Sequence, residues 1–362
     1  MRSAVFVFAG LLACSSPATV PLDAAREIDA GAPDSGEDAG VDRGVSVEVP
    51  LLAPPVARSE VASLGESNTL DLSSAFDVSS DGSVTVVWDS FDVDFTEGAL
   101  YTSRSPDGVA FAAAERLSGS DGARYEANPS FLDGRLYFWA ASDLRGASSL
   151  VERETGAARS LAGVSSLLSW PKLYAWGDKV AAAFRDVASV PRFVSGESLD
   201  TLGDSVAVAE PGALATLGLF ADGSLAYTYQ FPVGAEPMVS FVRRSSDGAE
   251  WSEAVRVSDA SSNVHDTTMV PRDDGGLDLY YIQTTPTSRG FVLYRRSLTS
   301  EGVLGMPEAL STERDWEPSK PQGVRLPSGE VLVGVANIAT RAPSGIPARQ
   351  EFLLFRLSSD AP

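Results

Sequence analysis

A short turn signal followed by a run of strand-forming residues recurs six times along the chain. Asp-Gly or a related pair forms each signal, as in VSSDGSVTVVW (78–88) and LFADGSLAYTY (219–229), because glycine adopts the positive φ of tight turns. The units are spaced by 52, 45, 44, 52 and 54 residues, counted between Asp81, Asp133, Asp178, Asp222, Asp274 and Ser328. A period of roughly 40–50 residues with about four strands per unit is typical of β-propellers.

A second series of turns lies between the units of the first. LYTSRSPDGVAF (100–111) and FVRRSSDGAEW (241–251) both predict a strand, a tight turn and a further strand. In each, the aspartate is expected to accept hydrogen bonds from turn N–H groups, and the aromatic residue to pack under the turn. We therefore assign a structural role to Ser105, Asp107, Gly108, Phe111, Ser245, Asp247, Gly248 and Trp251.

The repeat predicts an all-β fold, a six-bladed β-propeller with four-stranded antiparallel blades, and long helical periodicity is absent. LLFRLSSD (353–360) lies at the end of the sequence, and no fourth strand of the last blade follows it there. SEVASLGE (59–66) resembles the predicted fourth strand EAVRVSD (253–259). Because unpaired edges are usually avoided, we expect the upstream segment to complete the last blade and close the ring. The propeller would then span residues 59–360.

SPDGVAF and SSDGAEW resemble degenerate Asp-boxes, the Ser-x-Asp-x-Gly-x-x-Trp (BNR) turns of sialidase-like propellers. Both are one residue short between the aspartate and the aromatic residue. EANPSFLDG (126–134) also resembles the Pro-x-Phe-x-x-Asp-Gly units of other six-bladed propellers. The resemblance covers about residues 60–360 and rests on the turns, so it implies the fold more specifically than the function.

The N-terminus indicates export. MRSAVFVFAGLLAC has a positive start and an apolar run too short to span a bilayer, which predicts a signal peptide over residues 1–13. LLAC resembles the bacterial lipobox, so we expect lipidation of Cys14 and a cell-envelope location, with Ser15 favouring the outer membrane. An ordinary signal peptide containing a cysteine is the alternative. Residues 14–58 are expected to form a disordered acidic tether, whose acids fit no known calcium loop.

Charge and composition restrict the partners. The chain has 28 basic and 49 acidic residues, a formal net charge of −21, and no basic stripe, which argues against nucleic acid. Contact with the bilayer is expected through the lipid anchor alone. Its single cysteine allows no internal disulfide, and its single histidine no His-rich metal site. We expect a monomer without metal or cofactor.

The loops at one face of a propeller usually carry its ligand site. Residues of these loops include acids, arginines, amides and tryptophans, a mixture that suits a sugar or peptide ligand. The candidate ligand-binding residues are Arg124, Tyr125, Arg185, Gln230, His265, Trp316, Asn337 and Arg341. Trp170 and Asp92 lie in the same predicted loops.

Two hypotheses follow for this face. A lipid-anchored ring can bind a carbohydrate or an envelope protein without any specific acid pair, and this is the hypothesis we favour. A glycosidase of sialidase-like type instead needs two carboxylates, with Glu126, Asp266, Glu317, Asp89 and Asp186 as candidates. Arg124, Arg185 and Arg341 could form the arginine cluster of a sialidase, but the Phe/Tyr-Arg-Ile-Pro motif is absent. A Ser-His-Asp triad through His265 has no Gly-x-Ser-x-Gly motif to support it. Whether the protein is an enzyme stays open.

Overall fold

The computed structural model describes most of the chain downstream of the predicted tether. All described residues lie within one unit, Leu51–Pro362. They are residues 59–63, 69–92, 95–117, 123–232, 238–258, 264–284, 291–310, 317–341 and 347–357. The predictions made for residues 1–58, including Cys14, lie outside them.

Three sheets share one plan, in which four consecutive strands pair antiparallel in chain order. The first contains β10 (Lys172–Trp176), β11 (Lys179–Arg185), β12 (Pro191–Gly196) and β13 (Val206–Ala207). The second contains β14 (Ala213–Leu219), β15 (Leu225–Pro232), β16 (Met238–Ser245) and β17 (Val255–Arg256). The third contains β18 (Val264–Pro271), β19 (Leu277–Thr284), β20 (Phe291–Leu298) and β21 (Glu308–Ala309).

An eight-stranded sheet consists of two further antiparallel runs of four strands. The first run is β2 (Thr69–Val78), β3 (Val84–Asp92), β4 (Gly98–Ser105) and β5 (Glu115–Arg116). The second is β6 (Tyr125–Leu132), β7 (Arg135–Ala141), β8 (Ser149–Glu152) and β9 (Ala158–Arg159). A single parallel bridge between Gly98 and Tyr125 joins them, so the sheet is two blade-like units that touch at one point.

The fifth sheet brings the two ends of the described chain together. Its order is β22 (Glu317–Arg325), β23 (Val331–Arg341), β24 (Pro347–Leu357) and β1 (Ser59–Ser63). β1 pairs antiparallel with β24, with Ser59 opposite Arg356 and Ser63 opposite Leu353. The expected pairing of the upstream segment with the last strand is therefore present, and it covers part of an edge that would otherwise be unpaired.

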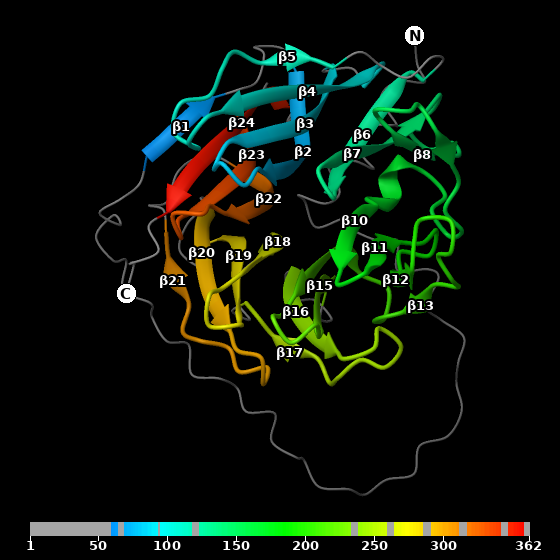
Figure 1. The fold of residues 1–362 in the computed structure, drawn as a ribbon, viewed down its shortest axis with the longest axis vertical. Helices are drawn as coiled ribbons and strands as arrows, with labels where there is room; N and C mark the ends of the chain where they lie inside the picture. Colours follow the sequence, from blue (N-terminus) through cyan, green and yellow to red (C-terminus); the bar gives the residue numbers. More distant parts are fainter. Residues whose placement is uncertain are drawn as a thin grey trace, which may run out of the picture. The chain divides into compact units, whose positions relative to one another are not determined.

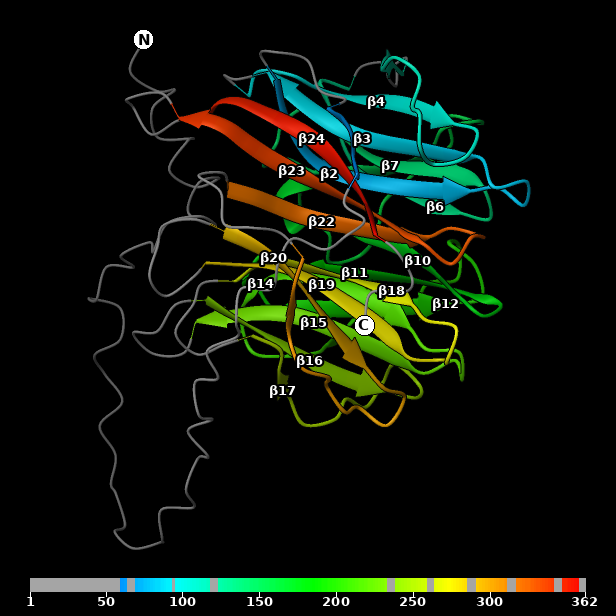
Figure 2. The same cartoon turned by 90° about the vertical axis from the view of Figure 1, so that its left-hand side faces the viewer.

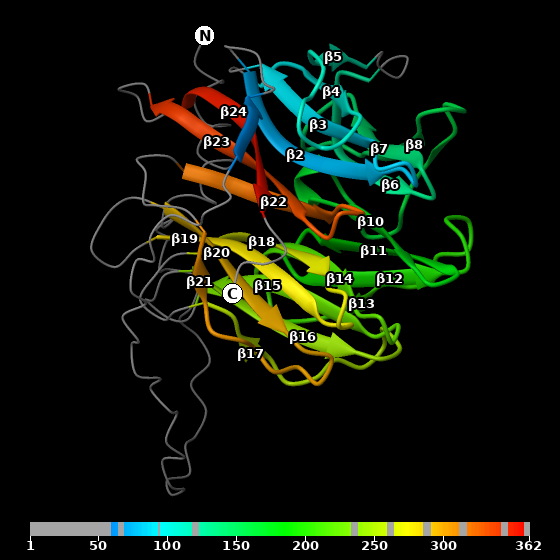
Figure 3. The same ribbon diagram turned by 60° about the vertical axis from the view of Figure 1, so that its left-hand side comes forward.

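The sheets succeed one another around a common centre (Figure 1). The first strand of each unit contacts the first strand of the next, in the order β2, β6, β10, β14, β18 and β22, and β22 contacts β2. Figures 2 and 3 show β22 beside β2 from two other directions. These six strands, here called the inner strands, form a closed ring.

The inner strands share an irregularity near their N-terminal ends. The pairing register shifts in β2, β6, β14, β18 and β22 at corresponding positions, opposite the C-terminal ends of their partner strands. At three of these bulges a non-glycine residue has positive φ: Asn128 (52°), Asp266 (46°) and Lys320 (48°). Trp170, which follows the 3-10 turn Leu167–Ser169 and precedes β10, also has positive φ (51°). A bulge re-aims side chains and backbone N–H groups, and here it does so at one end of the ring.

The turns and the core account for the regular part of the fold. The six predicted Asp-Gly-type turns each contain a glycine with positive φ, such as Gly82 (87°) and Gly223 (83°). Apolar side chains fill the spaces between neighbouring sheets; Phe193 and Tyr227, for example, belong to one cluster shared by two sheets. No helix in the described part is long and apolar enough to cross a bilayer.

The outer turn at Asp247 connects β16 and β17, away from the inner strands. Asp247 Oδ1 accepts hydrogen bonds from the N–H groups of Ala249 (2.9 Å) and Glu250 (3.1 Å). The half-buried Trp251 ring packs edge-on against Phe193 and Tyr227, at centroid distances of 5.5 and 5.4 Å. Asp107 likewise accepts a hydrogen bond from Val109 N–H at 2.9 Å.

Candidate functional site

A group of charged, amide and aromatic side chains lies at the bulged ends of the inner strands. We call it the central cluster. Its members are Asp89, Asn128, Trp170, Lys172, Arg185, Asp266 and Lys320. They come from five of the six four-stranded units around the ring, so the sequence brings them together only through the closed fold.

Asp89 of β3 joins two inner strands. Its Oδ1 accepts the Ser73 N–H (2.6 Å) and its Oδ2 accepts the Asn128 N–H (2.8 Å), so both carboxylate oxygens are engaged. Burial raises the pKa of Asp89, while the cations of Lys320 and Lys172 act in the opposite direction. Asp89 therefore holds β2 and the bulge of β6 in register.

Asp266 also accepts a hydrogen bond from a backbone N–H of another inner strand, but within the described part of the chain only one of its two carboxylate oxygens is bonded. Its Oδ2 accepts the N–H of Lys320 at 2.7 Å, which links β18 to β22. Its Oδ1 is buried and has no hydrogen-bond partner among the described residues. Burial raises the pKa of Asp266 to about 6, against the attraction of Lys320 and Arg185. This carboxylate can accept a further donor at the centre of the ring.

Two lysines span the centre from different sheets. Lys172 Nζ donates hydrogen bonds to the carbonyls of Ser74 (2.8 Å) and Pro129 (2.7 Å), which belong to two other units. Burial lowers the pKa of Lys172 to about 7, although Asp89 opposes this shift. Lys320 Nζ lies 3.0 Å from the centroid of the Trp170 ring, in a cation–π contact. β22 and β10 are not neighbours in the ring, so this contact crosses its centre.

Several residues of the cluster were candidates from the sequence alone. Asp89, Arg185 and Asp266 lie in it, and Arg185 Nε donates to the Leu168 carbonyl at 3.0 Å. Gln230, buried on β15, has a side-chain nitrogen without a hydrogen-bond partner in the described part of the chain. Glu126 is buried on β6 and has interactions of its own.

The side chains of three other candidates make local contacts: Asp186, Tyr125 and Arg124. Asp186 accepts hydrogen bonds from Ala188 and Val190 N–H (2.9 Å each) and pairs with Arg192. Although its partial burial opposes this, the bonds from Val190 and Arg192 lower the pKa of Asp186. The Tyr125 hydroxyl donates to the Phe95 carbonyl at 2.9 Å.

The exposed Arg124 lies over the Tyr125 ring, 5.8 Å from its centroid. The backbones of His265, Glu317, Asn337 and Arg341 lie in β18, β22 and β23. Their side chains, together with all of Trp316, are outside the described part.

Asn128, Lys172 and Lys320 were not predicted as site residues. One signal could have identified the lysines, because the chain contains only three lysines, at 172, 179 and 320, against 25 arginines. No comparable signal marks Asn128, whose position depends on the bulge of β6. Among the described residues, no group of His, Cys, Asp and Glu is arranged to hold a metal ion.

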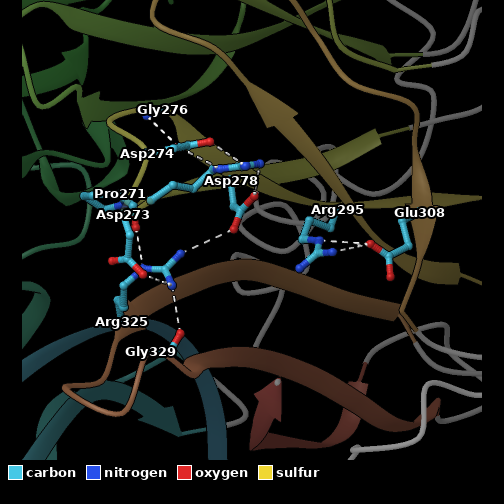
Figure 4. A network of polar contacts seen from close by, with 10 residues as sticks. Pro271, Asp273, Asp274, Gly276, Asp278, Arg295, Glu308, Arg325 and Gly329 are labelled. Carbon is cyan, nitrogen blue, oxygen red and sulfur yellow. Dashed lines mark hydrogen bonds and ion pairs between the residues drawn. The ribbon is translucent and has the colours of Figure 1, made fainter. Parts of the chain in front are cut away.

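A second polar network lies at the β18–β19 turn, at the other end of these strands (Figure 4). Arg325 of β22 donates from Nε to the Pro271 carbonyl (2.6 Å) and from Nη1 to the Gly329 carbonyl (2.8 Å). Asp278, whose side chain is 8% exposed, lies 3.5 Å from both Arg272 and Arg325. The pair of Asp278 and Arg325 joins β19 to β22, which belong to neighbouring sheets. This network therefore stabilises the contact between the two sheets.

Comparison with known proteins identifies the fold. Neither a family model nor a curated protein sequence matches the chain. A protein of unknown function from Dyadobacter fermentans superposes with a TM-score of 0.60 at 13% identity, over 84% of this chain and 99% of that one. The α-L-arabinanase of Penicillium chrysogenum, solved with arabinobiose, gives 0.57 at 14% identity, over 85% and 99%. The intramolecular trans-sialidase of Ruminococcus gnavus, solved with oseltamivir carboxylate, gives 0.52 at 10% identity, over 83% and 97%.

The chain is an all-β propeller. It is similar to propellers of glycoside hydrolases and sialidases, and at these identities the likeness concerns the fold. The central cluster lies at one end of the propeller's inner strands, where the first strand of each unit begins.

Proposed function

We propose that this propeller has six blades and binds a carbohydrate at the face formed by the central cluster. The observation that carries the proposal is the set of buried polar atoms there without a partner among the described residues: Asn128 Oδ1, Trp170 Nε1 and Asp266 Oδ1. Buried polar groups are nearly always hydrogen-bonded, so three such atoms in one cluster are sites at which the hydroxyl groups of a carbohydrate can bind.

The comparisons support the proposal at the level of fold. Two of the similar propellers, an arabinanase and a trans-sialidase, were solved with arabinobiose and with oseltamivir carboxylate. The glycan bound by this chain is a separate question, because fold alone does not carry substrate specificity.

The placement of the acids favours binding over hydrolysis by two carboxylates. Asp89 has both oxygens engaged by backbone N–H groups, and Asp186 is engaged by its own loop and Arg192. Asp266, by contrast, has one carboxylate oxygen without a hydrogen-bond partner among the described residues, and a ligand can bind to it. A binding protein needs no acid pair, whereas a glycosidase does.

Hydrolysis remains the second candidate because of one observation. The pKa of Asp266, raised by burial to about 6, is suited to a general acid near neutral pH. Glu126, buried on an inner strand, would then be the second carboxylate.

A panel of oligosaccharides tests both candidates. We would titrate arabinobiose, longer arabino-oligosaccharides, sialyllactose and neutral hexose oligomers into the full-length protein in detergent by calorimetry, and assay each mixture for hydrolysis products. We expect at least one to bind, and Asp266→Asn and Arg185→Ala to weaken it about 10–100-fold, the worth of a hydrogen bond to a charged group.

The exposed Lys179 provides the control, because Lys179→Met should bind as the wild type does. Unchanged affinity in both cluster variants would refute the site. Release of products by the wild type but not by Asp266→Asn would favour the glycosidase.

We also propose that the propeller is displayed from the cell envelope by a lipid on Cys14, with residues 14–58 as its tether. The apolar run before Cys14 and the composition of the following segment support this.

A further inference from the structure

Lysine is rare in this protein, and its placement is selective. Of the three lysines, Lys172 and Lys320 belong to the central cluster, and Lys179 lies at the exposed start of β11. Arginine supplies the cations of the ion pairs described above, such as Arg192 with Asp186 and Arg325 with Asp278. A lysine ammonium is a compact point charge, which fits a confined position over an aromatic ring.

The backbone of Lys320 is held in a conformation that residues other than glycine rarely adopt. Its φ is 48°, and its N–H is donated to Asp266 Oδ2 at 2.7 Å. Such a conformation persists where the surrounding structure enforces it. The bond to Asp266 fixes the bulge of β22 against β18, and from that bulge the side chain reaches Trp170 on the other side of the ring.

The charge of Lys320 acts on three titratable groups of the cluster. It lowers the pKa of Asp266 on β18 and of Asp89 on β3, and it also lowers that of Lys172 on β10. Arg185 of β11 is the other cation that acts on Asp266. Lys320 thus touches the aromatic ring and acts on both buried aspartates.

We propose that Lys320 is the positioning residue of the central site: its ammonium group holds the Trp170 ring across the centre of the propeller, and the same residue, bonded through its N–H to Asp266, supplies the counter-charge of that carboxylate. The inference rests on the proposed function for its biological meaning. The contact of Lys320 with Trp170 and the effect of its charge on Asp266 can both be measured without any glycan.

The contact with Trp170 is tested by NMR of the full-length protein labelled with [ε-13C]lysine, which gives three side-chain signals. The ring current of Trp170 should displace the Lys320 ε-protons upfield of those of Lys179. Trp170→Leu should abolish the displacement, and Lys320→Arg assigns the signal. Lys179, at the exposed start of β11 with its Nζ 5.0 Å from the centroid of Trp176, is the matched lysine–tryptophan control. A Lys320 signal without upfield displacement overturns the proposal.

The control of Asp266 is tested by melting pairs of proteins with and without Asp266→Asn between pH 4 and 9. In the wild-type background, the Tm of the Asp266→Asn protein should exceed that of the Asp266 protein by an amount that grows above the ordinary pKa of 3.8. This difference should level off near pH 6. In a Lys320→Met background the difference in Tm should level off at a higher pH. In Lys320→Arg and Lys179→Met backgrounds the pH at which half of the difference has developed, its midpoint, should stay near that of the wild type.

Identical midpoints in the Lys320→Met and wild-type backgrounds overturn the proposal. Failure of every glycan to bind would instead refute the proposed function and leave these two results standing.

Discussion

The buried Asp266 carboxyl gives the protein a pH dependence of stability that belongs to one residue. Its pKa is raised from 3.8 to about 6, so the folded state binds its proton more tightly than the unfolded state does. Stability associated with this group is therefore present below about pH 4 and is lost as the pH rises toward 6. Asp266→Asn removes that cost and still offers an oxygen to the Lys320 N–H.

We expect Asp266→Asn to be more stable than the wild type above pH 6, by about 1–3 kcal/mol from the size of the pKa shift, and equal to it below pH 4. Denaturant unfolding at pH 4 and pH 7.5 measures this. The control is Asp247→Asn, because hydrogen bonds from Glu250 and Ala249 N–H lower the pKa of Asp247, so this change should destabilise the protein at pH 7.5. A less stable Asp266→Asn at pH 7.5 would show that its charge stabilises the fold.

At the scale of the element, the outer turn at Asp247 shapes its blade. Trp251→Ala should cost roughly 2–3 kcal/mol, since a fully buried tryptophan is worth about 3–5 kcal/mol and this ring is half-buried. It removes edge-on contacts with Phe193 and Tyr227 and touches nothing at the central cluster. Thermal melting and glycan titration below the Tm check this together. Lost binding with normal melting would make the turn itself the site.

The turns could be predicted from the sequence, and the central cluster only in part. Asp-Gly fixes a tight turn locally, and Gly248 shows why: it has φ of 75°, and a Cβ there would lie 2.3 Å from the Phe193 ring. The bulge at Lys320 has no such local signal. It depends on a hydrogen bond that the Lys320 N–H donates to Asp266, a residue 54 positions away. Asp89, Arg185 and Asp266 were predictable because they follow or begin strand-forming runs.

For the whole molecule, ring closure depends on β1. Its pairing with β24, from Ser59–Arg356 to Ser63–Leu353, covers the outer strand of the last sheet. Deletion of residues 15–55 should leave the Tm unchanged, whereas deletion of 15–66 should lower it, because β24 then loses its partner. Differential scanning calorimetry compares the two. Equal Tm values would refute a stabilising role for the closure.

The proposed lipid anchor is also a property of the whole molecule. Wild-type protein should sediment with membranes and incorporate labelled palmitate in a bacterial host, and Cys14→Ala should do neither. Partition of both proteins into the soluble fraction would refute the anchor without bearing on the propeller.

The central claim is that the ligand binds at the centre of the ring, and the three lysines report on it directly. Protein labelled with [ε-13C]lysine is titrated with the tightest-binding glycan of the panel while the three signals are followed. The Lys172 and Lys320 signals should shift in a saturable manner with the same Kd as calorimetry gives, and the signal of Lys179, at the exposed start of β11, should stay in place. If the glycan binds with Lys172 and Lys320 unmoved, the site lies elsewhere and the account of the central cluster is wrong.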